Sequence, residues 1–165
     1  MGEEYDNLQV LSKINEKTIS QFSLDDTYQA LVDIGCEELG VDNGALFLTN
    51  NGQLDVKAIC ALNTEYFKLN YSLGASILEK ATSEIIIIDN LQQAKQENDY
   101  SQDLFITDGF KSLLAAPVFV DNELEGVLLF LHNTANHFSE EDFLPVETIT
   151  TQAPLVIKKA KIFQK

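Results

Sequence analysis

Residues 113–132 read LLAAPVFVDNELEGVLLFLH, and their pattern is the clearest sign of a β-sheet in the chain. Two runs of mostly aliphatic and aromatic residues, 113–120 and 124–132, flank Asp121-Asn122, a pair that favours a turn. The pattern predicts two antiparallel strands. Gly126 predicts a close approach of another helix or strand, and Pro117 predicts an edge, a bulge or a missing ladder bond.

A second hairpin is predicted earlier in the chain. Residues 45–48 have the composition of a strand, and residues 54–60 alternate between apolar and polar side chains. Asn50-Asn51-Gly52 lies between them, and Asn-Gly tolerates the positive φ angles of a tight turn. Residues 84–88 contain four consecutive isoleucines and predict a further, buried strand.

Two helices are predicted before these strands. Apolar residues recur at steps of three and four over residues 4–20, which is the helical period. A second helix begins after Ser23, a favourable N-cap residue, and ends at Gly40, which suits a helix C-terminus.

A long last helix is predicted to run to about Phe163. Phe138 precedes the N-cap Ser139 and is placed to pack the helix start against the core. Asp142 lies three residues after Ser139, as in a capping box with a shorter acid. Pro154 lies inside this helix and predicts a kink.

A polar connection, residues 90–109, separates the strand at 84–88 from the final hairpin. Connections of this length in compact domains are often lids or binding loops. The elements follow in the order helix, helix, hairpin, pocket segment, strand, lid, hairpin, helix. Antiparallel hairpins at both ends of one sheet, with helices on its faces, predict an α+β layered domain.

The composition is typical of one globular domain, with 165 residues of which 45% are hydrophobic. Cys36 and Cys60 are too few for a disulfide framework and suit a reducing compartment, so we expect a cytoplasmic protein. No apolar run approaches the roughly 20 residues of a membrane span. The acidic residues 1–6 do not resemble a signal peptide. We therefore expect no membrane partner.

The charge is strongly negative, with a formal net value of −15, and every basic residue is a lysine. An acidic surface without arginine repels phosphate backbones, so we expect no nucleic-acid partner. Four lysines gather near the C-terminus, at positions 158, 159, 161 and 165. They suit the C-terminal end of a helix dipole, and a membrane or anion patch is the alternative.

Taken together, five segments resemble a GAF domain over roughly residues 24–163. They are residues 31–42, 45–48, 109–118, 125–130 and 138–142, and they occur in the order and with the gaps that the family shows. The resemblance implies a GAF/PAS-like α+β fold with a central antiparallel sheet of about six strands, helices on both faces, and long first and last helices. It makes residues 1–165 a single domain, with a GAF core at 24–163 and a signalling or dimerisation helix at 1–22.

GAF domains sense small molecules in larger signalling proteins, and many pair through their first and last helices. The resemblance therefore implies a pocket between sheet and lid, a homodimer, and a ligand whose identity the sequence does not reveal. The expected pocket residues are Ile59, Cys60, Leu62, Ile77, Leu78, Tyr100, Asp103, Phe105, Thr107 and Leu129. Tyr100, Asp103 and Thr107 are the expected polar contacts. The alternative is that these residues fill the core and leave no pocket open.

Cyclic-nucleotide binding is a weaker alternative. Binders in the family often carry an Asn-Lys pair and a later Phe-x-x-x-Asp-Glu stretch. Phe138 and Asp142 match this stretch, but Phe143 stands in place of the Glu, and Asn133 is followed by Thr134. Ile59 and Cys60 also stand where binders place an aromatic residue and an acid beneath the base.

Catalysis, bilin attachment and metal binding are not expected. Free methionine sulfoxide reductases resemble GAF domains, but they need a second thiol to resolve the first. Cys36 is predicted to be buried in a helix, which leaves Cys60 without a resolving partner nearby. No histidine neighbours Cys60 to suggest a bilin site, and His132 and His137 alone are too few ligands for a metal.

The sequence thus favours a non-catalytic regulatory module. A small molecule is expected to bind between sheet and lid and to shift the arrangement of the terminal helices. A dimerising scaffold with a collapsed pocket is the competing interpretation.

Overall fold

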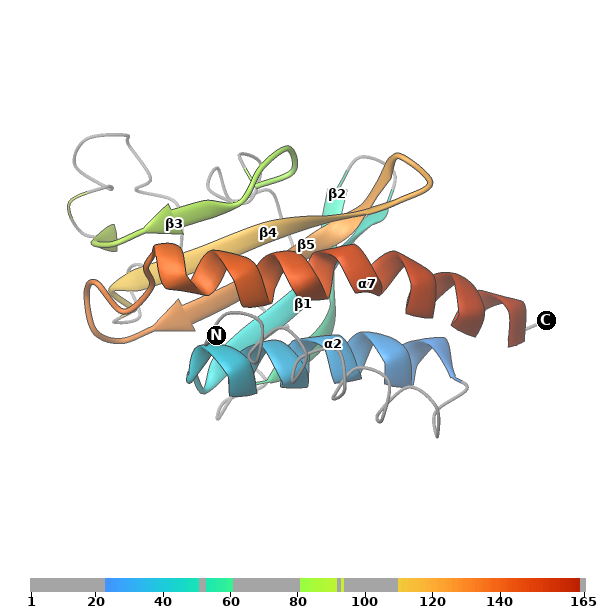
Figure 1. The fold of residues 1–165 in the computed structure, drawn as a ribbon, viewed down its shortest axis with the longest axis horizontal. Helices are drawn as coiled ribbons and strands as arrows, with labels where there is room; N and C mark the ends of the chain where they lie inside the picture. The colour runs from blue at the N-terminus through green and yellow to red at the C-terminus, as the bar shows by residue number, and fades with distance from the viewer. Residues whose placement is uncertain (1–22, 51–52, 61–80, 92, 94–109, 164–165) are drawn as a thin grey trace.

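The computed structural model describes residues 23–50, 53–60, 81–91, 93 and 110–163. The elements are, in order, α2 (Leu24–Leu39), β1 (Asn43–Asn50), β2 (Gln53–Cys60), β3 (Ile86–Ile88), β4 (Ser112–Val120), β5 (Glu123–His132), the 3₁₀ helix η1 (Glu140–Asp142) and α7 (Phe143–Phe163). The strands form one antiparallel sheet in the order β2-β1-β5-β4-β3 (Figure 1). The α+β prediction is confirmed, with five strands among the described residues instead of about six.

Both predicted hairpins are present. In the first, Asn50 pairs with Gln53, so two residues connect β1 and β2. In the second, Val120 pairs with Glu123 across Asp121 and Asn122, whose φ angles are 52° and 66°. Two successive positive φ angles are typical of a type I′ turn, whose twist matches that of the flanking strands.

The two unusual strand residues of the second hairpin have separate explanations. A Cβ atom at Gly126 would overlap the carbonyl oxygen of Phe47 on β1, so glycine is needed for the two strands to pair. Pro117 lies beyond the end of β3, which pairs with β4 only from Leu113 to Ala115. Among the described strands, Pro117 therefore has a neighbour on one side only, where a proline is tolerated.

The isoleucine strand differs from its prediction. The sequence predicts a buried strand over residues 84–88, but β3 comprises only Ile86–Ile88 and its side chains are half-buried. The reason is its position, since β3 lies at one of the two edges of the sheet that the described strands form. An edge strand has one neighbour and so loses less contact with solvent than a central one.

The predicted ends of α2 are confirmed. The backbone N–H of Asp26 donates to Ser23 Oγ at 3.0 Å, which satisfies one of the free donors at the helix start. Gly40 has a φ of 67°, and the N–H of Val41 donates to the carbonyl of Cys36 at 3.0 Å. This left-handed C-terminal residue closes the helix and turns the chain toward β1.

The start of α7 is also as predicted. The N–H of Ser139 donates to Asp142 Oδ2 at 2.9 Å, and Phe138 is almost completely buried. The helix continues through Pro154 to Phe163, so the proline does not end it. The predicted first helix, at residues 4–20, lies outside the described residues, as does most of the predicted lid at 90–109.

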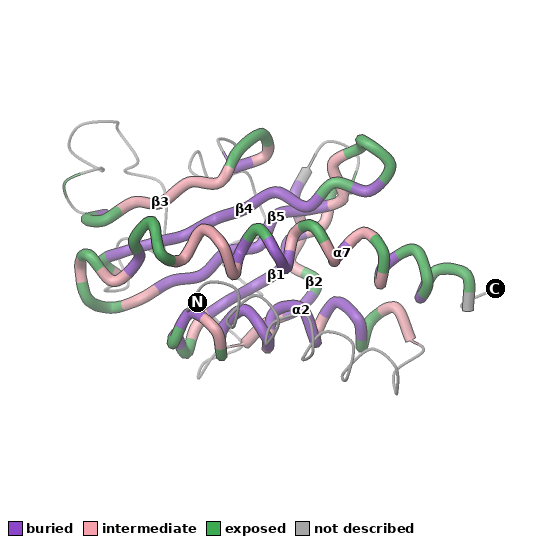
Figure 2. The backbone as a smooth tube through the Cα atoms, viewed as in Figure 1, coloured by how far each residue is buried: buried purple, intermediate pink, exposed green. Residues whose placement is uncertain are grey.

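Both described helices lie on the same face of the sheet (Figure 1). One hydrophobic cluster joins this face to α2 and α7, and a second cluster lies on the other face. Figure 2 shows that β1, β4 and β5, which both clusters share, are the most continuously buried strands. The prediction of helices on both faces therefore holds for one face among the described residues.

Two contacts fix α2 and α7 side by side in opposite directions. Near the start of α2, the Tyr28 hydroxyl donates to Glu125 Oε1 at 2.9 Å, and Lys161 Nζ of α7 donates to the same oxygen at 2.9 Å. Near the end of α2, the ring of His137, just before α7, bonds to the carbonyl of Leu39 at 2.9 Å. No helix within the described ranges is long and apolar enough to cross a bilayer.

Candidate functional site

The sheet face that points away from α2 and α7 is the face on which the sequence predicts a pocket. One row of paired residues crosses all five strands there: Ile59, Ala45, Leu129, Ala115 and Ile86. Ala45, Leu129 and Ala115 belong to the second hydrophobic cluster, and the half-buried Ile59 and Ile86 pack against it. We call this the open-face row, because α2 and α7 do not cover it.

Small residues occupy two of the inner places in this row. Ala45 and Ala115 flank Leu129, and the three are fully buried. Ala81 precedes β3 in the chain and Leu91 follows it. Both belong to the same cluster and help to cover these three residues. An alanine projects only a methyl group from the sheet, so Ala45 and Ala115 leave space beside Leu129 that the covering side chains occupy.

Three of the ten predicted pocket residues are described. Ile59 and Leu129 lie in the open-face row, on the same side of the sheet. Cys60 does not share this wall, because neighbouring residues of a strand point to opposite faces. It packs instead with the cluster on the helix side. The other seven lie outside the described residues: Leu62, Ile77, Leu78, Tyr100, Asp103, Phe105 and Thr107.

Ala45, Ala115 and Ile86 share this row with Ile59 and Leu129 but are not among the predicted pocket residues. Strand alternation was the signal that could have found the two alanines, because both lie in predicted strands, whose successive side chains point to opposite faces. The residues that pair with these alanines on the adjacent strands could not be predicted in the same way. Pairing depends on which strands lie together, and the order β2-β1-β5-β4-β3 is not a sequential order.

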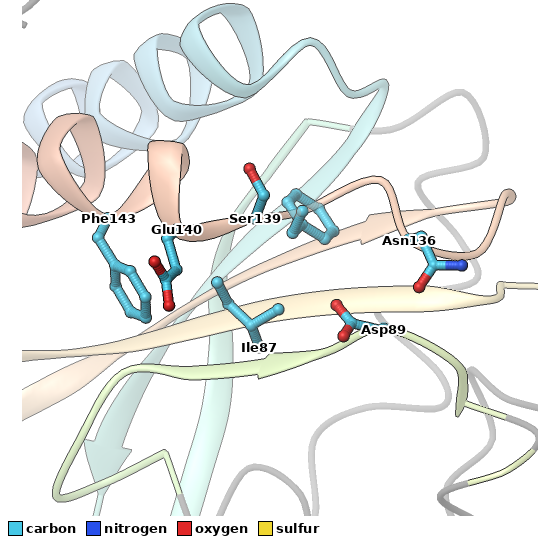
Figure 3. Close-up of a pocket in the computed structure, with 7 residues that line it drawn as sticks. Ile87, Asp89, Asn136, Ser139, Glu140 and Phe143 are labelled. Atoms are coloured by element: carbon cyan, nitrogen blue, oxygen red, sulfur yellow. The ribbon is translucent and has the colours of Figure 1, made fainter.

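A separate cavity of about 460 Å³ lies on the helix side, between β3 and the start of α7. Its residues are Ile87, Asp89, Asn136, Phe138, Ser139, Glu140 and Phe143 (Figure 3). The backbone N–H of Asn136 donates to the carbonyl of Asp89 at 2.8 Å, which ties the loop before α7 to the end of β3. The polar lining residues are exposed at its mouth, so this cavity is a shallow surface feature.

Two histidines stack beside the end of α2. The rings of His132 and His137 lie 3.8 Å apart at an angle of 10°. His137 Nε2 donates to the Leu39 carbonyl, and His132 Nδ1 accepts the Thr134 N–H at 3.1 Å. Burial lowers the pKa of His132, and the neighbouring His137 lowers it further. In the part of the chain that the structure describes, no three potential metal-binding side chains lie together.

The two cysteines require a correction. The sequence places Cys60 away from any second thiol, but in the structure the Cys36 sulfur lies against Gly44, the residue that pairs with Cys60 across the strands. Cys36 is buried in α2 and Cys60, at the end of β2, is half-buried. Burial raises the pKa of the Cys36 thiol well above its usual range, and the contact with Cys60 raises it further. The prediction failed because α2 crosses directly over the end of β2.

The family model of the GAF domain matches residues 23–157. The chain belongs to the GAF family. The match begins at the N-cap of α2 and includes all five strands and most of α7. None of the curated proteins compared with this GAF domain matches it.

Solved structures with the same fold come from proteins of different kinds. The GAF domain of a phosphoenolpyruvate-protein phosphotransferase from Acinetobacter is 22% identical, with a TM-score of 0.75, and the match covers 94% of this chain and 95% of that one. The corresponding domain from Coxiella burnetii is also 22% identical, with a TM-score of 0.75 and 96% of both chains covered.

An enzyme is among the similar structures. A free methionine-R-sulfoxide reductase from Neisseria meningitidis, solved with its substrate, is 13% identical, with a TM-score of 0.76, and the match covers 94% of this chain and 90% of that one. At these identities the similarity establishes the fold alone. The GAF fold serves regulatory domains and this enzyme alike, so function must be argued from the residues.

Proposed function

We propose that this GAF domain is a non-catalytic sensor that binds a small molecule against the open-face row and relays binding to α2 and α7. The observation that carries the proposal is the apolar row on the side of the sheet away from these helices, in which Ala45 and Ala115 are small residues on either side of Leu129. Small-molecule sites are usually lined mostly by apolar side chains, as this row is. The predicted polar contacts Tyr100, Asp103 and Thr107 would orient the ligand.

Strand β5 supports the relay. Leu129 faces the open side, and its neighbour Phe130 faces the helices. The Phe130 ring fills the space that side chains at Gly35 of α2 and Gly44 of β1 would otherwise occupy. A shift of β5 under a ligand would therefore press directly on α2, because a close-packed interior transmits small displacements.

The placement of the thiols favours a non-catalytic role. Both cysteines lie on the helix side, so neither points toward a ligand held against Leu129. The residues of the open-face row carry no nucleophile and no acid or base. A reductase would nevertheless show itself as turnover of free methionine sulfoxide with dithiothreitol, abolished in Cys60→Ser, and we expect none. The free thiols also suit the cytoplasmic location that we propose.

The competing function is a dimerising scaffold without a ligand. Leu155 and Ile162 favour it, since they are 62% and 66% exposed and lie seven residues apart on α7. Residues at this spacing share one helix face. In this alternative the open-face row is simply core, with no space left for a ligand.

A pair of alanine substitutions separates the two functions. Ala115→Leu adds bulk to the open-face row, and Ala116→Leu adds the same bulk to the helix-side core of the same strand. Ala115 is as fully buried as Ala116, so Ala115→Leu should change stability by less than about 1 kcal/mol only if ligand space beside Leu129 takes up the larger side chain. Ala116→Leu should cost about 1–3 kcal/mol, as overpacking does. Urea unfolding measures both.

Thermal shift with a panel of nucleotides, amino acids, organic acids and haem then tests binding. A specific ligand should raise the midpoint of the wild type and of Leu155→Ala, but not of Ala115→Leu. A response to cyclic nucleotides alone would select that class of ligand. The sensor proposal fails if Ala115→Leu is as destabilising as Ala116→Leu and no compound in the panel shifts the midpoint.

A further inference from the structure

The two thiols lie in a small space between α2 and the first hairpin. Cys60 at the end of β2 pairs with Gly44 at the start of β1. A Cβ atom at Gly44 would lie 2.6 Å from the Sγ of Cys36. Because Gly44 has no side chain, the Cys36 sulfur can lie directly against it. Gly44 pairs with Cys60, so the two cysteines are neighbours across this position.

Another contact holds the two elements at this distance. Gln29 Nε2 of α2 donates to the carbonyl of Ile59 at 2.8 Å, one residue before Cys60. Together with the packing of both cysteines in one cluster, this bond keeps α2 against the end of β2. A disulfide needs Cβ atoms roughly 3.5–4.5 Å apart, a separation compatible with two cysteines of one cluster that both lie beside Gly44.

We propose that Cys36 and Cys60 form a reversible intramolecular disulfide when the protein meets a hydroperoxide. The Cys60 thiolate attacks the terminal peroxide oxygen, the O–O bond breaks, and an alcohol leaves, or water when the oxidant is hydrogen peroxide. The product is a sulfenic acid at Cys60. The Cys36 sulfur then attacks the Cys60 sulfur, the S–S bond forms, and the sulfenic oxygen leaves as water with the Cys36 proton. The two thiols together lose two electrons, and one peroxide molecule gains them.

The order of the two steps follows from exposure. Cys60 is half-buried and can meet the oxidant, whereas Cys36 is only 4% exposed and is shielded from it. Because burial raises the pKa of Cys36, its thiolate is scarce and the second step should become faster as the pH rises. The bond would fasten α2 to the sheet edge, a redox control separate from the proposed ligand site on the other face.

The test treats the folded wild-type protein with hydrogen peroxide in slight excess and follows both thiols. We expect the denatured product to contain no thiol, to weigh two hydrogens less than the reduced chain, and to run as a monomer on a non-reducing gel. Peptide mapping should join the segments that contain Cys36 and Cys60. Dithiothreitol should restore both thiols.

Single variants provide the controls. Cys36→Ala should stop at the sulfenic acid of Cys60, trapped by dimedone, and Cys60→Ala should keep its Cys36 thiol under the same conditions. The proposal is overturned if the wild type, like Cys36→Ala, accumulates only oxidised Cys60 while Cys36 stays a thiol. It is equally overturned if the disulfide joins two chains. Both outcomes are read on the wild type, so a variant that folds poorly does not weaken the test.

Discussion

Phe130 shows how single residues set the spacing between layers. Its ring occupies the place of absent side chains at Gly35 and Gly44, and it is completely buried between α2 and the sheet. Close packing of this kind makes small changes of volume costly, since protein interiors have few voids to absorb them. Glycines at such contacts are therefore as important to stability as the large residues that they face.

Gly126→Ala should lower the free energy of unfolding by about 1–3 kcal/mol, the usual cost of forcing extra volume into a packed site. The added Cβ would meet the carbonyl oxygen of Phe47, which belongs to the backbone of β1 and cannot rotate away. Urea unfolding measures the loss. Gly40→Asn is the control, because no atom lies near its Cβ position and asparagine tolerates the positive φ. Equal stabilities for Gly126→Ala and wild type would contradict the close approach of β1 to β5 at Gly126.

Protonation of His132 should destabilise the fold. Its pKa is lowered in the folded state, by burial and then by His137, so the unfolded chain binds the proton more readily. Stability is therefore complete above the unfolded pKa of about 6.5 and falls as the pH drops below it. Thermal midpoints between pH 7.5 and 5.5 should decline more steeply for the wild type than for His132→Gln. Parallel curves for the two proteins would show that His132 does not contribute.

At the level of elements, α7 contains an identifiable weak point. Pro154 lacks the N–H that would donate to the carbonyl of Thr150, yet the helix continues through it. Pro154→Ala should raise the free energy of unfolding by about 1–3 kcal/mol, up to the full difference in helix propensity. Leu155→Ala, at an exposed neighbouring position, should change it by less than about 0.5 kcal/mol. A loss of stability in Pro154→Ala would mean that the proline is needed for the path of the helix.

The bond network at Glu125 joins three elements and should be cooperative. Glu125 of β5 accepts from buried Tyr28 of α2 and from exposed Lys161 of α7. Tyr28→Phe should cost about 1 kcal/mol, the usual value of a partly buried hydrogen bond, and Lys161→Met less than about 0.5 kcal/mol. In a double-mutant cycle with Glu125→Gln, the tyrosine pair should show the larger coupling. Additive effects would mean that the two helices are not linked through this carboxylate.

At the level of the whole molecule, the expected dimer can be tested on α7. The exposed apolar residues Leu155 and Ile162 lie on one face of the helix, and burying them would remove apolar surface from water. Light scattering at high micromolar concentration should give twice the chain mass of 18.4 kDa for the wild type. Leu155→Lys with Ile162→Lys should give the monomer mass, with a thermal midpoint that no longer rises with protein concentration. A wild type that stays monomeric at this concentration would contradict the dimer.

The local elements of this GAF domain could be predicted because their signals are local. Ser23 and Gly40 mark the ends of α2 through bonds to residues three or four positions away. Asp121-Asn122 marks a turn through its own φ angles. Caps, turns and alternation depend on neighbours in the chain, so one sequence contains all the information that they need.

Only the tertiary structure decided which residues from distant segments become neighbours. Ile59 and Cys60 are adjacent in the chain but belong to opposite faces of the sheet, one in the open-face row and the other against Cys36. The four isoleucines predicted a buried strand and formed a half-buried edge, because the order of strands, not their composition, sets burial. Composition and period are properties of a segment, whereas a pocket wall and a thiol pair are properties of the way in which distant segments pack.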